Sequence, residues 1–111
     1  MALFDVAVTQ DEGKVVAVLS GEVDLSTVAD VERRLDAALP GDAPLMVLDL
    51  RAVTFLDSSG LRLVLRTDKR QRSGGNRLVI VQGPRRVARL FEITGIGAEV
   101  EIVDDPADIS T

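Results

Sequence analysis

The order of hydrophobic and polar residues at the start of the chain predicts a β-hairpin. Residues 3–9 alternate between the two kinds, as Leu-Phe-Asp-Val-Ala-Val-Thr, which is typical of a strand with one buried face. Residues 11–13, Asp-Glu-Gly, favour a turn, and residues 14–20 again read as a strand, Lys-Val-Val-Ala-Val-Leu-Ser. We therefore expect two antiparallel strands at the beginning of the fold.

The hydrophobic period changes after this hairpin and indicates a helix followed by a buried strand. Over residues 27–39 the apolar side chains recur at helical spacing, and the pair Pro40-Gly41 is expected to end this helix. Residues 45–50 are almost continuously apolar, and the pattern extends through residues 53–56. A run of this kind predicts a strand in the interior of a sheet.

Helix and strand continue to alternate up to the end of the chain. A second helix is expected over about residues 61–72 and is followed by a strand at residues 78–81. A third helix is expected over about residues 84–94; it opens with a proline, which suits a first helical turn, and Gly95 caps it. Residues 100–103 are expected to form the last strand.

Strands that alternate with helices of this length indicate parallel βαβ units. The predicted fold class is therefore α/β: a mixed, mostly parallel β-sheet opened by an antiparallel hairpin, with helices packed on it. We expect one domain over residues 1–111, with its core in about residues 3–105, because a chain of this length supports a single hydrophobic core. Residues 104–111 look loose, although Asp105-Pro106 favours one last short helix.

The composition excludes several kinds of chemistry. The chain contains neither cysteine nor histidine, so it has no cysteine nucleophile, no disulfide, no histidine base and few of the usual zinc ligands. We therefore expect no metal, no cofactor and no enzymatic activity. No apolar run approaches the ~20 residues that a membrane span needs. The N-terminal segment is acidic where a signal peptide is basic, so we expect a cytoplasmic protein without membrane insertion.

Charge is unevenly distributed along the chain. The net charge is -5, yet residues 51–89 contain ten basic residues against Asp57 and Asp68, while both ends of the chain are acidic. In a folded domain such segments interleave and neutralise one another; a basic surface that faces an acidic partner is the alternative. The total charge has the wrong sign for a phosphate backbone, and no Trp or Tyr is present to stack on bases. Nucleic acid is therefore not an expected partner.

The most informative segment is the junction at residues 55–61, Phe-Leu-Asp-Ser-Ser-Gly-Leu, where a buried strand meets a helix. Asp57 or Ser58 is expected to cap the free amide groups of the first helical turn. Gly60 allows another backbone or a ligand to come close. Taken alone, this string predicts a well-capped helix and no activity.

Other motifs surround this junction in a fixed order. They are Gly-Glu-Val-Asp at residues 21–24, Val-Leu-Asp-Leu at residues 47–50 and Gly-Gly at residues 74–75. A late motif is added by Val87, Arg89, Leu90-Phe91 and Ile93-Thr94-Gly95-Ile96. With this order and spacing, about residues 3–105 resemble the STAS domains, and among these most of all the bacterial anti-sigma-factor antagonists.

The resemblance implies a phosphorylation-switched, protein-binding regulator of transcription. In that family the unphosphorylated domain binds a kinase-fold anti-sigma factor, a serine kinase, and frees the sigma factor; phosphorylation reverses this, and a phosphoserine phosphatase restores it. The family's phosphoacceptor matches Ser58, while Ser59 matches a residue of the first helical turn. Asp24 matches an acid beside the acceptor. The residues expected to contact the partner are Asp24, Asp57, Ser59, Gly60, Arg62 and Arg66.

Elementary electrostatics is consistent with such a switch. A phosphate on Ser58 is expected to face the amide groups at the start of the helix, which stabilise an exposed anion by up to ~1 kcal/mol. Two unit charges ~5 Å apart at an effective dielectric constant of ~20 repel by about 3 kcal/mol. An acidic group of a partner near the phosphate is therefore expected to weaken binding. Asp24 and Asp57 also have an ordinary interpretation as turn and cap residues.

Two features depart from the family pattern. Small residues are usual near positions 62 and 66, where this chain has Arg62 and Arg66, and a large apolar residue is usual near Asp68. On a helical wheel Arg62, Arg66 and Arg70 form one stripe, and Asp68 can reach a base one turn later, at Arg72. The stripe is interpreted either as a solvated face or as a site for the phosphate or for an acidic partner.

Other functions fit the sequence less well. A serine hydrolase lacks a base here, and a phosphorylated receiver domain would need an acidic cluster and a late lysine that the chain does not have. The remaining alternative lies within the same fold: a STAS regulatory subunit of an ABC-type lipid transporter, or a stressosome-like scaffold module.

Overall fold

The computed structural model describes residues 3–39 and 41–110. Within these residues, five strands, three α-helices and two short 3-10 helices follow one another. In order they are β1 (Phe4–Asp11), β2 (Lys14–Val23), α1 (Val28–Ala38), β3 (Leu45–Leu56), α2 (Ser58–Ser73), β4 (Arg77–Val81), α3 (Arg85–Thr94), η1 (Ile96–Ala98), β5 (Glu101–Val103) and η2 (Pro106–Asp108).

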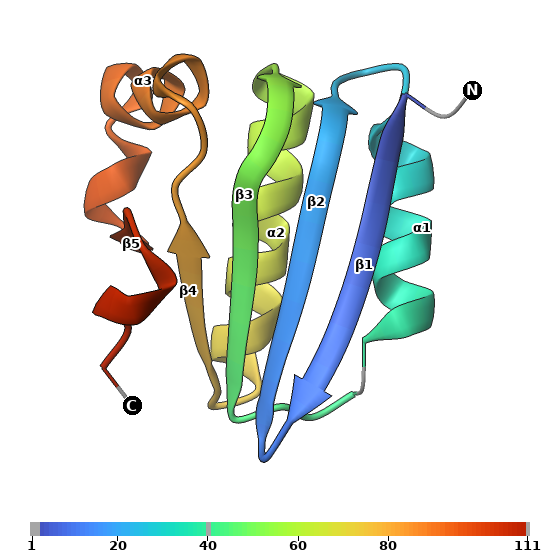
Figure 1. Ribbon diagram of the computed structural model, residues 1–111, viewed down its shortest axis with the longest axis vertical. Coiled ribbons are helices and arrows are strands. Elements are labelled where there is room, and N and C mark those ends of the chain that lie inside the picture. The colour runs from blue at the N-terminus through green and yellow to red at the C-terminus, as the bar shows by residue number, and fades with distance from the viewer. Residues whose placement is uncertain (1–2, 40, 111) are drawn as a thin grey trace.

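The strands form a single sheet in the order β1-β2-β3-β4-β5. β1 and β2 pair in antiparallel fashion, and the three remaining pairs are parallel. The predicted fold class is thus confirmed, including the opening hairpin. Helices α1 and α2 lie next to each other behind the sheet, and α3 stands at the end of the sheet where β3 finishes (Figure 1).

One hydrophobic cluster joins the sheet to all three α-helices. Its strand members occupy matching positions in neighbouring strands, as in Ala17, Leu48 and Ile80, which are fully or almost fully buried. Each α-helix contributes the apolar stripe that its sequence predicted. The buried helical residues of the cluster are Val31 and Leu35 of α1, Leu61, Leu63 and Val64 of α2, and Val87 and Phe91 of α3.

Strand β2 continues to Val23, three residues beyond the predicted end at Ser20. The extension follows a shift in its pairing with β3, and Gly21 makes this path possible. Gly21 has a φ of 83°, and a Cβ at this position would lie only 2.1 Å from the backbone oxygen of Leu3. Any other residue would therefore be strained there and would collide with β1.

Helix α1 ends one residue before its predicted end at residue 39. α1 ends at Ala38, and Leu39 caps it; Pro40, which was expected to end this helix, lies outside the described residues. The short helix expected at Asp105-Pro106 is confirmed as η2, and the Asp105 side chain accepts a hydrogen bond from the amide of Ala107 at 2.8 Å.

Within the described residues, no helix is long and apolar enough to span a bilayer.

Candidate functional site

Apart from Arg66, which lies in the middle of α2, the predicted site residues lie where β2 and β3 end and where α1 and α2 begin (Figure 1). Because β2 and β3 are parallel neighbours, their carboxyl ends meet at one edge of the sheet, with Val23 paired to Leu56. The loop of residues 24–27 and the start of α2 therefore stand side by side. This geometry brings Asp24 and the 57–60 segment to the same end of the molecule.

Asp57 holds these two segments together. Its backbone adopts an extended conformation as the N-cap of α2, and its Oδ1 accepts hydrogen bonds from the amides of Ser59 at 2.8 Å and Gly60 at 3.0 Å. Its Oδ2 accepts a third bond, at 3.0 Å, from the amide of Leu25 in the loop before α1. The predicted cap is confirmed, and α2 begins at Ser58 instead of Leu61 because this cap organises a polar first turn.

Replacing Asp57 with Ala is expected to lower the free energy of unfolding by about 1–2 kcal/mol, since a helix cap and a bond between two loops are both lost. Asp57→Asn is the matched control: its amide oxygen still caps α2, but the amide nitrogen cannot accept the bond from Leu25. The asparagine variant should therefore lose less than the alanine variant. Urea unfolding measures both, and an alanine variant as stable as the wild type would contradict the role given to Asp57.

The capping hydrogen bonds of Asp57 also change the surroundings that are expected for a phosphate on Ser58. Two amides at the start of α2, those of Ser59 and Gly60, already donate to the Asp57 carboxylate. The expectation that a phosphate on Ser58 would face these amides therefore needs correction. Such a phosphate would instead be attached next to an existing carboxylate, and its charge would add to that of Asp57.

The two serines of the junction differ sharply in their surroundings. Ser58 is the first residue of α2 and is exposed, and its hydroxyl makes no hydrogen bond with any described residue. Ser59 is only 7% exposed, and its Oγ accepts a bond of 3.4 Å from Nη2 of Arg62. Of these two hydroxyls, that of Ser58 is the one that is exposed and makes no hydrogen bond with the described residues.

Asp24 organises the turn that leads into α1. Its Oδ1 accepts bonds from the Ser26 hydroxyl at 2.7 Å and from the Ser26 and Thr27 amides at 2.9 and 3.2 Å. The bond from the Ser26 hydroxyl, followed by those from the backbone, holds the pKa of Asp24 below its ordinary value. The carboxylate is therefore charged at neutral pH. No hydrogen bond joins it to Ser58 among the residues described, and Asp57 links the two segments instead.

Gly60 is needed for a close approach between α2 and β2. A Cβ on Gly60 would lie 2.4 Å from the backbone oxygen of Val23 and 2.5 Å from Cδ1 of Leu56. The sequence predicted that this glycine lets another backbone come close, and that backbone is the end of β2. Gly60 is buried, so its role in the described structure is to seat α2 against the sheet.

Two arginines of the predicted stripe pair with carboxylates of α1. Nε and Nη2 of Arg66 each donate to the Glu32 carboxylate at 3.1 Å. Nη1 of Arg70 donates to Oδ1 of Asp36 at 2.6 Å. Both pairs are exposed, so each stabilises the packing of α1 on α2 by about 1 kcal/mol or less. The structure thus gives Arg66 and Arg70 a role between the helices.

Arg62 is the exception in this stripe. It contacts no carboxylate of the described residues and reaches only the Ser59 hydroxyl. Of the three arginines it is also the one within a turn of Ser58.

The predicted contact from Asp68 to Arg72 is confirmed at 3.2 Å, so the buried Asp68 carboxylate has a counter-ion.

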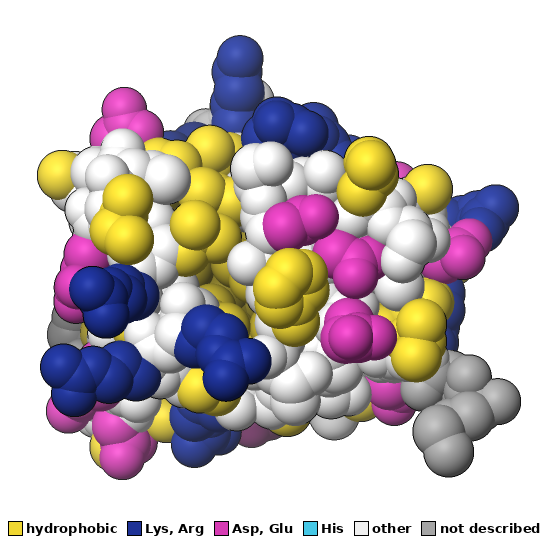
Figure 2. All heavy atoms as spheres, turned by 90° about the horizontal axis from the view of Figure 1, so that it is seen from above, with side chains coloured by type: hydrophobic (Ala, Val, Ile, Leu, Met, Phe, Trp, Pro, Cys, Tyr) yellow, Lys and Arg dark blue, Asp and Glu magenta, His cyan; other side chains and the backbone are white. Residues whose placement is uncertain are grey.

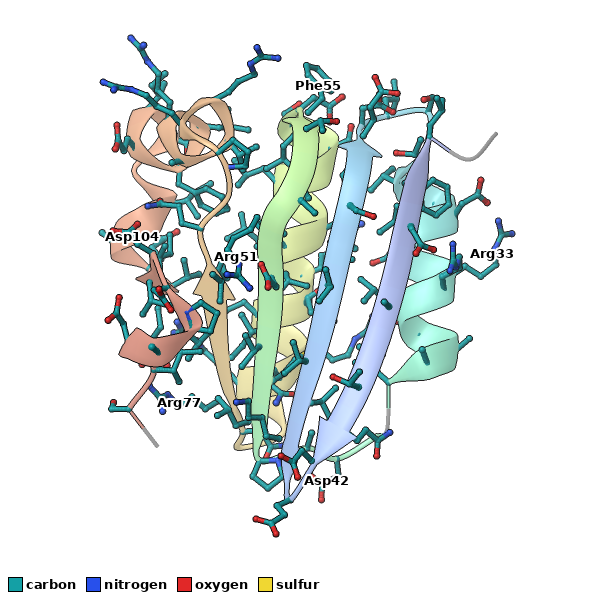
Figure 3. All side chains as sticks on the ribbon, viewed as in Figure 1. Arg33, Asp42, Arg51, Phe55, Arg77 and Asp104 are labelled. Atoms are coloured by element: carbon teal, nitrogen blue, oxygen red, sulfur yellow. The ribbon has the colours of Figure 1, made fainter. Side chains whose placement is uncertain are left out.

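The sequence did not predict that two hydrophobic residues near the site are exposed. Leu25 is 76% exposed and Phe55 is 41% exposed, and Phe55 stands at the tip of β3 beside the start of α2 (Figure 3). Figure 2 looks onto the end of the molecule where β2 and β3 finish. Acidic side chains and a protruding hydrophobic side chain gather there on the side of the β2–α1 loop. Basic side chains gather over α3. Exposed apolar side chains next to Ser58 are suited to a protein contact.

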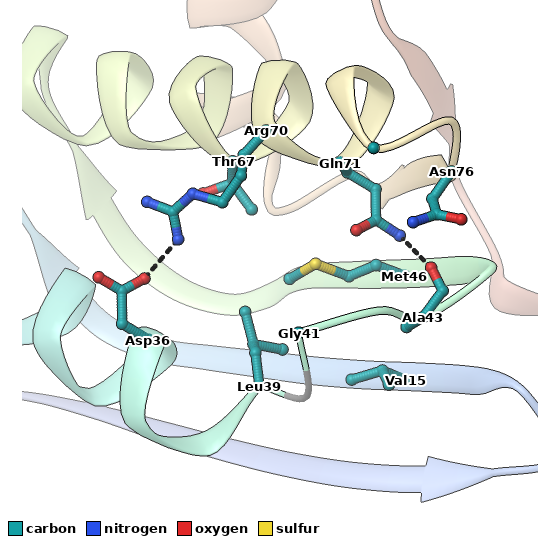
Figure 4. A pocket seen from close by; sticks show the side chains of 11 residues that line it. Val15, Asp36, Leu39, Gly41, Ala43, Met46, Thr67, Arg70, Gln71 and Asn76 are labelled. Carbon is teal, nitrogen blue, oxygen red and sulfur yellow. Dashed lines mark hydrogen bonds and ion pairs between the residues drawn. The ribbon is translucent and has the colours of Figure 1, made fainter.

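A hollow of about 190 Å³ lies at the opposite end of the helices, away from these residues (Figure 4). The pair Asp36–Arg70 borders it, and Nε2 of Gln71 donates to the backbone oxygen of Ala43 at 2.7 Å beside it. None of the predicted site residues lines this hollow. Among the residues that the structure covers, no cluster of acidic side chains is arranged to hold a metal ion.

Comparison with known proteins gives a consistent result. A family model described as "Mlab, STAS domain" matches residues 6–104. The anti-sigma-B factor antagonist of Staphylococcus aureus is 35% identical over 101 residues, which cover 84% of this chain and 93% of the relative. The crystal structure of an anti-sigma factor antagonist from Mycobacterium paratuberculosis has a TM-score of 0.80 and 28% identity, and covers 95% of this chain and 89% of its own.

A second structure is more distant in sequence and shows the shared fold. It is the Bacillus cell fate determinant SpoIIAA in its phosphorylated form, with a TM-score of 0.68 and 20% identity over 93% of this chain and 95% of its own.

Proposed function

Since the chain belongs to the STAS domain family, we propose that it is an anti-sigma-factor antagonist whose binding is switched by phosphorylation of Ser58. In the unphosphorylated state it binds a kinase-fold anti-sigma factor and so releases a sigma factor. The anti-sigma factor phosphorylates Ser58, and a phosphoserine phosphatase removes the phosphate. The names of the relatives support the antagonist role, and the phosphorylated form solved for SpoIIAA supports the switch.

The observation that carries the proposal is the contrast between the two serines. A kinase phosphorylates a hydroxyl that can enter the active site of the kinase. Ser58 is exposed and its hydroxyl makes no hydrogen bond with the described residues, whereas Ser59 is buried. The exposed Leu25 and Phe55 would lie in the interface with the anti-sigma factor, since Leu25 donates its amide to Asp57 and Phe55 stands at the tip of β3, both close to Ser58 in the chain or in space. A phosphate on Ser58 then adds charge in the middle of this contact.

The chain itself supplies no chemistry for the switch. The Ser58 hydroxyl has no base within hydrogen-bond distance among the described residues, and the chain has no histidine. The Mg-ATP site and the base must therefore come from the kinase. Incubation of the purified chain with Mg-ATP alone should give no phosphoprotein.

Ser58→Ala is expected to abolish phosphorylation by the cognate anti-sigma factor, whereas Ser59→Ala should retain it. The measurement is incorporation of labelled phosphate followed by mapping of the phosphopeptide. Ser59→Ala is the matched control, because it removes a neighbouring hydroxyl from the same helical turn. A phosphate found on Ser59, Ser20 or Thr27, or labelling of the wild type without any kinase, would contradict the proposal.

The cognate kinase is identified with the wild-type chain as bait in native lysate. Recovery of a kinase-fold anti-sigma factor supports the proposed function. Recovery of an ABC ATPase in its place would favour the alternative, a regulatory subunit of a lipid transporter.

A further inference from the structure

Three arginines near the start of α3 differ from most other basic residues of the chain. Arg85, Arg86 and Arg89 are exposed, and none of them makes an ion pair or a hydrogen bond with a residue that the structure describes. Dark-blue side chains gather over α3 in the view onto this end of the molecule (Figure 2). The arginines that do form ion pairs are Arg33, Arg34, Arg51, Arg66, Arg70, Arg72 and Arg77.

The position of these charges is unfavourable for the isolated domain. The amino end of a helix carries a partial positive charge, which favours acidic side chains and opposes basic ones. The first turn of α3 contains no acidic residue, and Pro84 at its N-cap offers no side-chain hydrogen bond. Arg85 and Arg89, one helical turn apart, also repel each other. Stability of the fold therefore gives no reason for this arrangement.

Packing of α3 does not require the arginines either. The helix is held to the core by Val87, Ala88 and Phe91, which are at most 9% exposed. Its outer side carries one large apolar residue, Ile93, which is 73% exposed. Ile93 lies four residues after Arg89 and seven after Arg86, so these three side chains share one face of the helix.

We propose that the outer face of α3, made of Arg85, Arg86, Arg89 and Ile93, is a docking surface for an acidic polypeptide segment of a partner protein. Guanidinium groups bind carboxylates with two parallel hydrogen bonds, and three free guanidinium groups within five residues suit a segment rich in Asp and Glu. Ile93 offers an apolar contact beside them. This surface goes beyond the Ser58 switch and does not depend on it.

The charges around α3 favour an acidic polypeptide over other anionic partners. A shallow hollow lined by Arg85, Ala88 and Arg89 also includes the exposed carboxylate of Glu92. A long phosphate polymer would meet this carboxylate and a chain of net charge -5. A membrane surface would find a single exposed apolar side chain, Ile93, on this helix, which is too little for insertion. A short acidic segment can instead place its carboxylates between the arginines.

The test is a titration of the isotope-labelled, unphosphorylated chain with a poly-glutamate peptide, followed by NMR amide shifts. Shifts confined to α3 are expected, and binding should weaken as salt rises. The variant with Arg85→Gln, Arg86→Gln and Arg89→Gln should bind at least about tenfold more weakly. A variant with Lys14→Gln, Arg33→Gln and Lys69→Gln removes the same charge elsewhere and should bind as the wild type does.

A second readout separates binding from a merely structural role. The triple α3 variant should unfold at the same temperature as the wild type or a higher one, because it removes repulsion at the start of a helix. Equal poly-glutamate affinity of the two triple variants, or shifts outside α3, would overturn the proposal. So would tighter binding to a DNA duplex or to phosphatidylglycerol vesicles at the same salt concentration. The titration needs no kinase, so its outcome is independent of whether Ser58 is phosphorylated.

Discussion

Phosphorylation of Ser58 is expected to weaken the complex with the anti-sigma factor by about a hundredfold while leaving the fold intact. The phosphate adds about -1.5 to -2 charges to an exposed position directly after Asp57. An acidic group of the partner ~5 Å away would then be repelled by about 3 kcal/mol at an effective dielectric constant of ~20, which corresponds to two decades of affinity. Calorimetric titration of the phosphorylated and unphosphorylated chains measures the difference, and circular dichroism reports the fold.

Ser73→Asp provides a control for charge at a distance from this interface. Ser73 is the exposed last residue of α2, four helical turns from Ser58, and should tolerate a carboxylate without loss of binding. Ser58→Asp should show the same direction as the phosphate with a smaller effect, because one carboxylate carries less charge. Unchanged binding of the phosphorylated chain would rule out this switch.

Replacing Gly60 with Ala is expected to lower the free energy of unfolding by about 2–3 kcal/mol. Alanine has the higher helix propensity by about 1 kcal/mol, so the variant would be more stable if propensity alone decided. The added Cβ would however lie 2.4 Å from the backbone oxygen of Val23, and a backbone atom of a sheet cannot move aside as a flexible side chain can. Steric overlap therefore outweighs propensity, and α2 must shift away from β2.

Gly41→Ala is the matched control for this substitution, because a Cβ at Gly41 meets no atom within 4 Å. Urea unfolding of both variants gives the comparison. Gly41→Ala should be nearly neutral, and a Gly60→Ala variant at least as stable as the wild type would show that α2 has room at this position.

Hydrophobic patterns predict the fold of this chain well because the helices and strands β1 and β2 bury one face, while β3 and β4 contain continuous buried runs. The pattern is less informative about the start of α2. Residues 58–60 carry no apolar side chain, so a hydrophobic period becomes visible only at Leu61, although the helix starts at Ser58. The cap at Asp57 marks the true start, and its chemistry was readable in the sequence.

Contacts between distant elements could not be read from the sequence in the same way. The helical wheel places Arg62, Arg66 and Arg70 on one stripe, and Arg66 and Arg70 each meet an acid 34 residues earlier in the chain. Those partners depend on how α1 packs against α2, which no local pattern encodes. A position on a stripe is therefore insufficient to show whether an arginine is free.

The exposed Phe55 illustrates another limit. The run at residues 53–56, Val-Thr-Phe-Leu, predicts a buried strand, yet both Thr54 and Phe55 are exposed while Val53 and Leu56 are buried. Strict alternation fails here, and β2 and β3 change register along the same stretch. Such irregularity follows from the pairing of two strands, so it is visible only in the fold.

The hydrogen bond from the Leu25 amide to Asp57 provides a natural spectroscopic reporter. This amide belongs to the loop before α1, but its acceptor lies 32 residues away, directly before Ser58. Its chemical shift and its hydrogen-exchange rate therefore depend on the electrostatic state of the α2 start. If Ser58 is phosphorylated, as proposed, the phosphorylated fraction is expected to be measurable from this one backbone resonance, with no dye or tag attached near Ser58.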